Sequence, residues 1–433
     1  MVRGMRLRMM IGVLDAGLLA TGLTAGLTAT PAVAAPQPAG VEHGGVLQQL
    51  LDAEHAAGMP GVFAEVRTGG ATWQGAAGVA DVDTGRPVRP WFEHRVGSIT
   101  KTFVATTVLQ LVGEHRVRLD APIGDYLPDV VTGDTGRQVT VDMLLRHTSG
   151  LGNYTDLINS YEAMEVLRTL TITPLEIAAI GLGLPRLFPP GTAWSYSNTN
   201  YILDGLLVER VTGHRVADEV GRRVLRPLGL RHTYFPGTDP VIRGPHANAY
   251  VPWPDGTLRD FSVFNMSWAW AAGELISTPQ DLNRFYRALL TGRLLSPPLL
   301  AAMRTTVPMD PTVPELAGYG YGLYWEQLPC GRAWGHTGGV IGQTTVSLHS
   351  PDGSRQVTMG ENLTFITDPQ QDQAIALARA RFLITALCGP QQTPTADQTA
   401  TADQATAVAQ PRGPVGTSAH PAGPLPPAVG PHR

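Results

Sequence analysis

Lysine is almost absent from this sequence of 433 residues. Lys101 is the one lysine, and the other 31 of the 32 basic residues are arginine. A site that needs only positive charge accepts arginine, but a site that needs an amine able to lose its proton does not, because a guanidinium stays protonated near neutral pH. Codon bias against lysine is the other explanation, and the sequence leaves both open. Ser98 precedes Lys101 by three residues, which makes the two residues a candidate nucleophile and base.

An excess of charge is also absent. The net charge is -4 and 16% of the residues are charged, so there is no basic field that would attract nucleic acid. The sequence has no Gly-Lys pair for a phosphate loop, no His-Glu-x-x-His and no Gly-x-Ser-x-Gly, the motifs of nucleotide, zinc and α/β-hydrolase sites. We therefore expect no nucleic acid partner, no metal and no cofactor.

Long apolar runs are absent beyond the N-terminal region. There, three arginines precede an apolar stretch from residue 9 to about 30, and Ala32-Val33-Ala34 follows it as a small-residue cleavage site. A retained membrane anchor is the alternative, because about 20 apolar residues can span a bilayer. We expect a signal peptide at 1–34 and a secreted, extracellular protein without a membrane span.

Cysteine is scarce, with only Cys330 and Cys388 in the chain. An oxidising compartment permits a disulfide, and an even number leaves no orphan thiol. We expect these two residues to form a bridge, and two buried free thiols are the alternative.

The apolar patterns predict strands at both ends of the chain and helices between them. Strands are expected at 62–67 and 71–79 and up to Val96, and again within 319–328, 332–338, 343–350 and 356–362. Helices are expected at 46–57, from Ser98 or Ile99 onward, after Thr140 as N-cap, at 199–211 and at 371–387. In the helix after Ser98, the spacing of Phe103, Val104, Val108 and Leu111 predicts one buried face.

This order predicts an α+β fold in which both groups of strands join one antiparallel sheet, flanked by the N- and C-terminal helices. We expect one domain at 35–390, with its sheet part at about 44–97 and 266–390. A mainly helical insertion would occupy about 98–265, and the active site would lie in the cleft between them. Residues 391–433 are rich in Pro, Ala and Thr without apolar periodicity, so a disordered tail is expected there.

Three short segments carry groups that could perform chemistry together. Ser98 and Lys101 lie one helical turn apart, so a desolvated amine can take the proton of the hydroxyl. Tyr196 and Asn198 follow "PPGTAW" and precede a helix; a phenol can shuttle protons and an amide can orient a substrate. His336-Thr337-Gly338-Gly339 would lie on a strand whose glycines admit a substrate backbone. Taken alone, the tyrosine is more often a packing residue, and "HTGG" is more often a strand end followed by a turn.

Together, these segments resemble the three signature motifs of the penicillin-recognising serine hydrolases, which include D-alanyl-D-alanine carboxypeptidases, class C β-lactamases, esterases and aminopeptidases. The likeness extends to "LLRHTSGL" at 144–151, "SYSNTNY" at 195–201 and "SWAWAAGELIS" at 267–277, and covers about residues 44–390. It is greatest to the secreted carboxypeptidases of actinomycetes. It implies a serine β-lactamase-like fold, and it also implies the signal peptide and the bridge between Cys330 and Cys388.

The resemblance further implies a role for each motif residue. Ser98 would be the acylated nucleophile, Lys101 its general base and Tyr196 the proton shuttle to the leaving amine. The backbone N–H groups of Ser98 and Gly339 would form the oxyanion hole. The remaining residues would bind substrate or assist: Asn198 at the substrate amide, His336 and Thr337 at the carboxylate end, Gly338 along the strand, and Trp268 as an aromatic wall.

The chain departs from the carboxypeptidase pattern at three positions. Tyr324 stands where those relatives have the arginine that binds the terminal carboxylate, and Gly339 and Ile341 replace a hydroxyl and an amide. Arg332, on the same strand face as His336, is a candidate replacement for the arginine.

We predict a monomeric serine hydrolase that acts on a small peptide or β-lactam-like acyl donor, with D-alanyl-D-alanine carboxypeptidase as the leading activity. An esterase, a D-aminopeptidase or a β-lactamase is the alternative within the family. A penicillin sensor that is acylated without turnover is the alternative outside enzymes.

Overall fold

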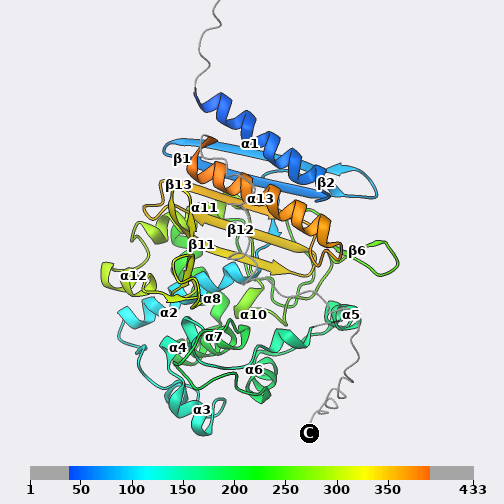
Figure 1. Cartoon of the computed structure of the whole chain (residues 1–433). Coiled ribbons are helices and arrows are strands. Elements are labelled where there is room, and N and C mark those ends of the chain that lie inside the picture. The colour runs from blue at the N-terminus through cyan, green and yellow to red at the C-terminus, as the bar shows by residue number, and fades with distance from the viewer. Residues whose placement is uncertain (1–38, 159, 391–433) are drawn as a thin grey trace, which may run out of the picture. The chain divides into compact units, whose positions relative to one another are not determined.

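The computed structural model describes residues 39–158 and 160–390 (Figure 1). The predicted signal peptide at 1–34 and the predicted tail at 391–433 lie outside these residues. No helix in the described part is both long and apolar enough to cross a membrane.

A single antiparallel sheet of nine strands organises the described residues. Strands from both ends of the chain meet in it, because β1 pairs with β13. In spatial order the strands are β3 (Arg86–Pro87), β2 (Ala71–Asp81), β1 (Gly61–Thr68), β13 (Arg355–Glu361), β12 (Gln343–His349), β11 (Gly331–Val340), β10 (Tyr324–Leu328), β9 (Ala317–Tyr319) and β8 (Val307–Pro308). The predicted fold class is therefore confirmed.

Two short strand pairs accompany this sheet. β4 (His94–Arg95) pairs with β7 (Ile276–Ser277), just before the nucleophile segment. β5 (Tyr250–Pro252) and β6 (Leu258–Asp260) form a hairpin inside the region expected to be helical. The sequence analysis missed this hairpin, which is only three residues long on each side.

Helices cover both faces of the sheet. Helices also make up much of the chain between β4 and β7 in the sequence. The longer ones are α1 (Ala39–Ala56), α2 (Thr100–Gly113), α5 (Tyr161–Thr169), α6 (Pro174–Gly183), α7 (Asn198–Thr212), α11 (Pro279–Leu290), α12 (Pro297–Met303) and α13 (Pro369–Cys388). The shorter ones are α3 (Gly133–Gln138), α4 (Val141–Leu145), α8 (Val216–Val220), α9 (Arg226–Leu228) and α10 (Trp270–Gly273). The 3₁₀ turns are η1 (Gly97–Ile99), η2 (Ile123–Asp125) and η3 (Tyr154–Leu157), and η4 (Gly221–Leu225) is a π-helical turn.

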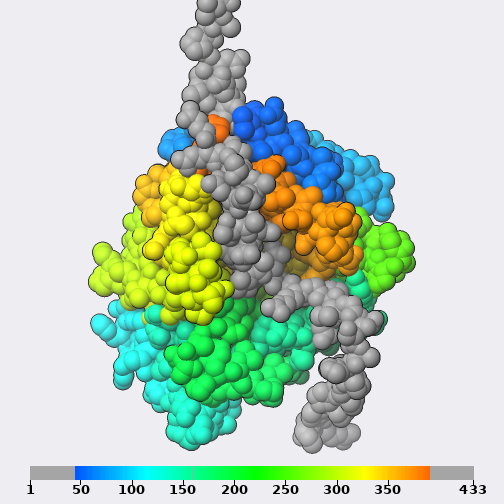
Figure 2. Space-filling model, viewed as in Figure 1, coloured from blue at the N-terminus to red at the C-terminus, as the bar shows by residue number. Residues whose placement is uncertain are grey.

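The first and last described helices pack side by side on one face of the sheet, as the neighbouring blue and orange surfaces in Figure 2 show. Alternating residues on that face, such as Val346, Leu348, Val357 and Met359, are fully buried beneath them. Since successive side chains of a strand point to opposite faces, this alternation defines the packed side. α11 packs on the opposite face, against β1, β12 and β13.

Helix α2 differs from its predicted environment. Its apolar positions predict one buried face, yet its threonines at 102, 106 and 107 are fully buried as well. The hydroxyls of Thr106 and Thr107 donate to carbonyls one turn earlier, at 2.7 and 3.0 Å, and Thr102 Oγ1 donates to the carbonyl of Gly322 at 2.6 Å. These hydrogen bonds offset the cost of burying hydroxyls, so the helix that follows the nucleophile is enclosed on all sides.

The predicted bridge is present. Cys330 and Cys388 form a disulfide with their Cα atoms 5.4 Å apart. It ties the turn between β10 and β11 to the end of α13. The strand that carries His336 is therefore linked covalently to the C-terminal helix.

Candidate active site

Ser98 lies in the 3₁₀ turn η1, where this turn meets strand β11. Gly97 has a φ of +52°, and a Cβ atom on it would lie 2.8 Å from the backbone N of Gly339. A Cβ atom on Gly338 would lie 1.9 Å from the carbonyl O of Val96 and 2.8 Å from the backbone N of Ser98. Only glycine permits this approach of two backbones. The backbone amides at Ser98 and Gly339 therefore come to the same region, as an oxyanion hole requires.

Lys101 Nζ makes three hydrogen bonds. It lies 3.0 Å from Ser98 Oγ, 2.7 Å from Asn198 Oδ1 and 2.7 Å from the carbonyl O of Ala272. The amide and carbonyl oxygens can only accept, so they fix the direction of two N–H groups. A neutral amine has two hydrogens, and its lone pair then faces the third partner, the hydroxyl of Ser98.

Burial favours this neutral form. The Lys101 side chain is fully buried, and this burial lowers the pKa of its amine well below the ordinary lysine value. No carboxylate contacts the amine among the described residues, so no negative charge there raises the pKa of Lys101 again. The ring centroids of Tyr196 and Tyr201 lie 4.9 and 5.5 Å from Nζ. The arrangement suits an amine that accepts a proton during reaction.

Asn198 orients Lys101 rather than offering its amide to solvent. It is the first residue of α7, and its Oδ1 accepts from the lysine. Its Nδ2 donates to Asn153 Oδ1 at 3.2 Å and to Thr155 Oγ1 at 3.0 Å. All polar atoms of this side chain are thus engaged within the protein. Asn153 and Thr155 carry no motif signal, so the sequence analysis missed them.

Tyr196 lies beside both Lys101 and Ser98. Its hydroxyl is buried and has no hydrogen-bond partner within the described part of the chain. Burial raises the pKa of the phenol, and the interaction with Ser98 opposes this in part. Tyr196 is therefore protonated at neutral pH and holds a proton that a leaving group could receive.

His336 and Thr337 lie on β11 next to Tyr324. The ring centroids of His336 and Tyr324 are 5.5 Å apart, and those of His336 and Tyr196 are 6.4 Å apart. Burial, followed by the Lys101 charge, lowers the pKa of His336 to about 3, so its imidazole is neutral. Thr337 Oγ1 and Tyr324 Oη are both buried, and neither makes a hydrogen bond of ordinary geometry with a described residue. Burial raises the pKa of the Tyr324 phenol, and an interaction with Thr337 opposes this in part.

One edge of β11 is open beside these residues. β10 pairs with β11 from Gly331 to Gly335 and no further, whereas β12 pairs with β11 up to Val340. The segment from His336 to Gly339 therefore has a strand on only one side among the described residues. An extended ligand can add to such an edge through backbone hydrogen bonds.

Two residues that were predicted to bind substrate make their contacts outside the hydrogen-bonded group around Ser98. Arg332 is exposed, and its guanidinium stacks on Trp325 at 3.8 Å from the ring centroid. It does not take the place of the missing arginine in this structure. Trp268 is buried, its carbonyl accepts from Tyr154 Oη at 2.7 Å, and its ring lies edge-on to Phe264. The hydrogen bonds and ring contacts that Trp268 makes with the described residues do not include one with Ser98.

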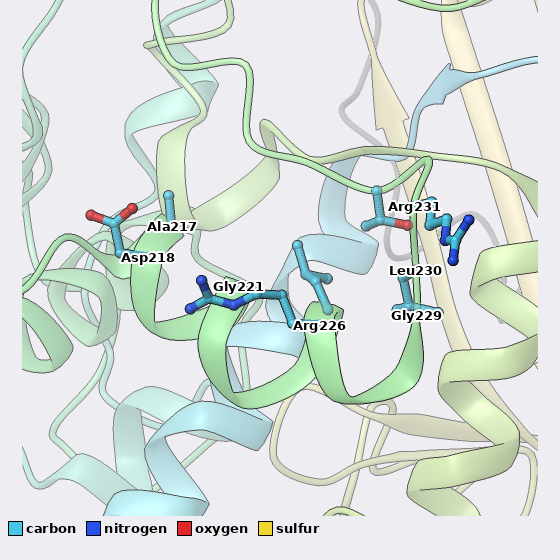
Figure 3. A pocket seen from close by; sticks show the side chains of 9 residues that line it. Ala217, Asp218, Gly221, Arg226, Gly229, Leu230 and Arg231 are labelled. Carbon is cyan, nitrogen blue, oxygen red and sulfur yellow. The ribbon is translucent and has the colours of Figure 1, made fainter.

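A separate hollow of about 500 Å³ is lined in part by η4 and α9 (Figure 3). Its lining includes Asp218, Arg226, Arg231 and Thr233. The hydroxyl of Thr233 is bonded to Ser277 and Asp281, and no nucleophile and base are paired there. The described residues also contain no cluster of His, Cys, Asp and Glu suited to a metal ion. The candidate site is therefore the group around Ser98.

Comparison with known sequences agrees with this geometry. A sequence model of the family described as "Beta-lactamase" matches residues 47–380. This chain belongs to the beta-lactamase family.

The proteins that the chain resembles are named for different activities or ligands. The chain is 30% identical to "Penicillin-binding protein 4" of Amycolatopsis lactamdurans over 66% of this chain and 76% of that protein. It is 33% identical to "Esterase EstB" of Burkholderia gladioli over 49% of this chain and 54% of that protein, so the match spans about half the length of the esterase. A solved structure of a D-stereospecific amidohydrolase from Streptomyces sp. superimposes with a TM-score of 0.71 at 38% identity, covering 80% of this chain and 99% of that one. The chain is thus a serine hydrolase of the beta-lactamase and penicillin-binding protein family.

Proposed function

We propose that this member of the beta-lactamase family hydrolyses amide or ester bonds of D-amino acyl substrates through an acyl-enzyme on Ser98. The observation that carries the proposal is that no described arginine hydrogen-bonds to or stacks on the buried Tyr324. Burial, and then the neighbouring Glu326, raise the pKa of the Tyr324 phenol, and His336 beside it is neutral. A substrate that ends in a carboxylate would lack a partner cation there, and a charge-assisted hydrogen bond contributes about 1.5 to 3 kcal/mol.

The reaction would proceed in two halves. Ser98 Oγ attacks the carbonyl carbon while its proton passes to Lys101 Nζ, and the oxyanion receives hydrogen bonds from the N–H groups of Ser98 and Gly339. The C–N or C–O bond then breaks, and the leaving group takes a proton delivered through Tyr196. Water attacks the ester in the second half, its proton returns by the same groups, and Ser98 recovers its hydroxyl. No cofactor enters any step.

The second candidate is the D-alanyl-D-alanine carboxypeptidase favoured by the sequence resemblance. The similarity to a penicillin-binding protein supports it, as do the buried hydroxyls of Thr337 and Tyr324, which could hold a carboxylate by neutral hydrogen bonds. We also propose export of the chain, because a disulfide is typical of oxidising compartments.

The two activities are distinguished with matched peptides. A D-Ala-D-Ala peptide is assayed as the free acid and as its C-terminal amide, beside anilides of D- and L-amino acids. We expect the D-anilide and the peptide amide to reach at least the kcat/KM of the free acid, because the charge-assisted contact that would favour the acid by about 10- to 100-fold is missing. Preference for the free acid would establish the carboxypeptidase instead. Rapid hydrolysis of a labelled penicillin would indicate a β-lactamase, and a stable penicillin adduct without turnover of any peptide would indicate a sensor.

A further inference from the structure

The segment "LLRHTSGL" contains a histidine, His147, that the proposed reaction does not use. His147 is fully buried two residues after the end of α4 and has a left-handed backbone with a φ of +62°. Its ring lies 4.3 Å from the ring of Tyr196, centroid to centroid. A buried histidine in an unfavourable backbone conformation beside the proton shuttle needs an explanation.

The hydrogen bonds of His147 fix which of its nitrogens carries the proton. Nδ1 lies 3.2 Å from the backbone N of Ser197, which can only donate, so Nδ1 accepts. Nδ1 also lies 3.1 Å from Asn200 Nδ2. The orientation of that amide is fixed as well, since Ser149 Oγ accepts from the backbone N of Leu151 and donates to Asn200 Oδ1 at 2.7 Å. Burial and the Lys101 charge lower the pKa of His147, so the ring is neutral and its one proton is on Nε2.

Nε2 of His147 faces a second histidine through one phenol. It lies 3.2 Å from Tyr319 Oη, which lies 2.9 Å from His336 Nε2. His147 can donate to this phenol, and the phenol donates its own proton to His336, rather than to Tyr201, which also interacts with Tyr319, if His336 Nε2 is an acceptor. His336 Nδ1 then carries the proton of that ring, and it faces the backbone carbonyl of Thr337, which can only accept. The assignment obtained from the Ser197 end agrees with the one required at the Thr337 end.

From this directed chain of hydrogen bonds we infer that His147 and Tyr319 are positioning residues, which hold His336 in the Nδ1–H tautomer and fix its ring across from Tyr196. The chain begins and ends at backbone groups, so its direction cannot reverse without leaving a buried donor or acceptor unsatisfied. It also joins the segment that carries Tyr196 and Asn198 to the strand that carries His336. Only Lys101 is then left to change its charge during reaction.

The groups around His336 agree with this assignment. Tyr196, Tyr319 and Tyr324 have raised pKa values because they are buried, so they stay neutral. Tyr201, the other phenol near Tyr319, donates its proton to the carbonyl of Leu145 at 2.8 Å. Glu326 lies beyond Tyr324, and burial raises its pKa to about 8. Among the described residues, Lys101 is therefore the basic group whose charge, when the amine is protonated, acts on both imidazoles.

The test on the unaltered protein is the tautomer state itself. Long-range ¹H–¹⁵N correlation spectra of the full-length protein distinguish Nδ1–H from Nε2–H rings, and the signals of His147 and His336 are identified by their loss in His147→Gln and His336→Gln. We expect Nε2–H for His147 and Nδ1–H for His336, without titration between about pH 5 and pH 9. An Nε2–H tautomer at His336, or a titration of either ring near its ordinary value, would overturn the inference.

Tyr319→Phe tests the consequence. It removes the donor to His336 Nε2, so the pKa of His336 rises, the tautomer is no longer fixed and kcat/KM falls about tenfold, the effect of one lost hydrogen bond. The matched control is Tyr286→Phe, another fully buried phenol, whose hydroxyl contacts Thr102 and not His336. An unchanged His336 spectrum in folded Tyr319→Phe, or the same spectral change in the control, would contradict the proposed role. The spectra do not depend on the substrate, so a wrong proposed function leaves them interpretable.

Discussion

Lys101 Nζ lies 3.0 Å from Ser98 Oγ, and its other two hydrogen bonds go to oxygens that can only accept. This geometry gives a chemical reason for one lysine in a chain that otherwise uses arginine. A guanidinium at the same position would present only donors to the serine. The relationship between these two residues leads directly to the first prediction.

Lys101→Arg is expected to abolish acylation of Ser98, since general-base catalysis contributes about 10² to 10⁴ in rate. The measurement is intact mass spectrometry after reaction with labelled penicillin, followed over time. Arg118→Lys, an exposed exchange of the same two residue types in reverse, serves as the control and is expected to acylate normally. Acylation of Lys101→Arg at the normal rate would mean that positive charge is enough.

The pH dependence of kcat/KM should report the Lys101 amine. Because burial lowers its pKa, the base is neutral and active at pH values below the ordinary lysine value, and activity rises as the pH increases through this lowered pKa. Asn198→Asp would place a carboxylate at the position of Oδ1, 2.7 Å from Nζ, which raises that pKa and moves the rising limb to higher pH. Gln327→Glu, on the exposed position of β10, adds the same charge away from the site and should not move it. A rising limb that is the same in Asn198→Asp and in the unaltered enzyme would argue against Lys101 as the base.

Tyr324→Arg should restore recognition of a terminal carboxylate. With one charge-assisted contact of about 1.5 to 3 kcal/mol gained, kcat/KM for the D-Ala-D-Ala free acid is expected to rise about 10- to 100-fold relative to the peptide amide. Tyr324→Phe removes the hydroxyl without adding charge and is the matched control. An equal effect of Tyr324→Arg on the acid and the amide would show that position 324 does not face the carboxylate.

A buried acid pair between the terminal helices and the sheet should make stability depend on pH. Glu54 is fully buried, and its burial together with Glu361 raises its pKa well above the ordinary value, while Glu361 pairs with Arg379 at 2.7 Å. A raised acid pKa means that the folded chain keeps a proton that the unfolded chain loses. The free energy of unfolding therefore falls as the pH rises from the ordinary glutamate value to the raised one.

Glu54→Gln removes this loss. In urea titrations, the free energy of unfolding of the variant is expected to match that of the unaltered protein at about pH 4 and to exceed it at about pH 9. Glu315→Gln, at an exposed position, should change neither value. A lower stability of Glu54→Gln at high pH would show that the carboxylate is needed there.

Much of the fold follows from short-range patterns. The strand predicted at 343–350 spans Gln343–His349, and Thr140, which was expected as an N-cap, accepts a hydrogen bond from the backbone N of Met143. The helix predicted at 199–211 spans Asn198–Thr212. The enclosure of α2 was not predictable, because the partners of its buried threonines include the carbonyl of Gly322, more than 200 residues away.

The candidate site divides in the same way. By itself, the sequence pointed to the residues that are proposed to carry the chemistry, because a nucleophile, a base and a proton shuttle restrict the residue types at fixed short spacings: Ser98 with Lys101, and Tyr196 with Asn198. Their catalytic roles, and that of Gly339, stay predictions until the variants are measured. The tertiary structure alone decided which groups meet: the carbonyl of Ala272 at Lys101, Asn153 at Asn198, and Tyr319 between His147 and His336. A hydrogen bond requires its two atoms to lie within about 3 Å, and packing of segments far apart in the chain, not their local pattern, sets that distance.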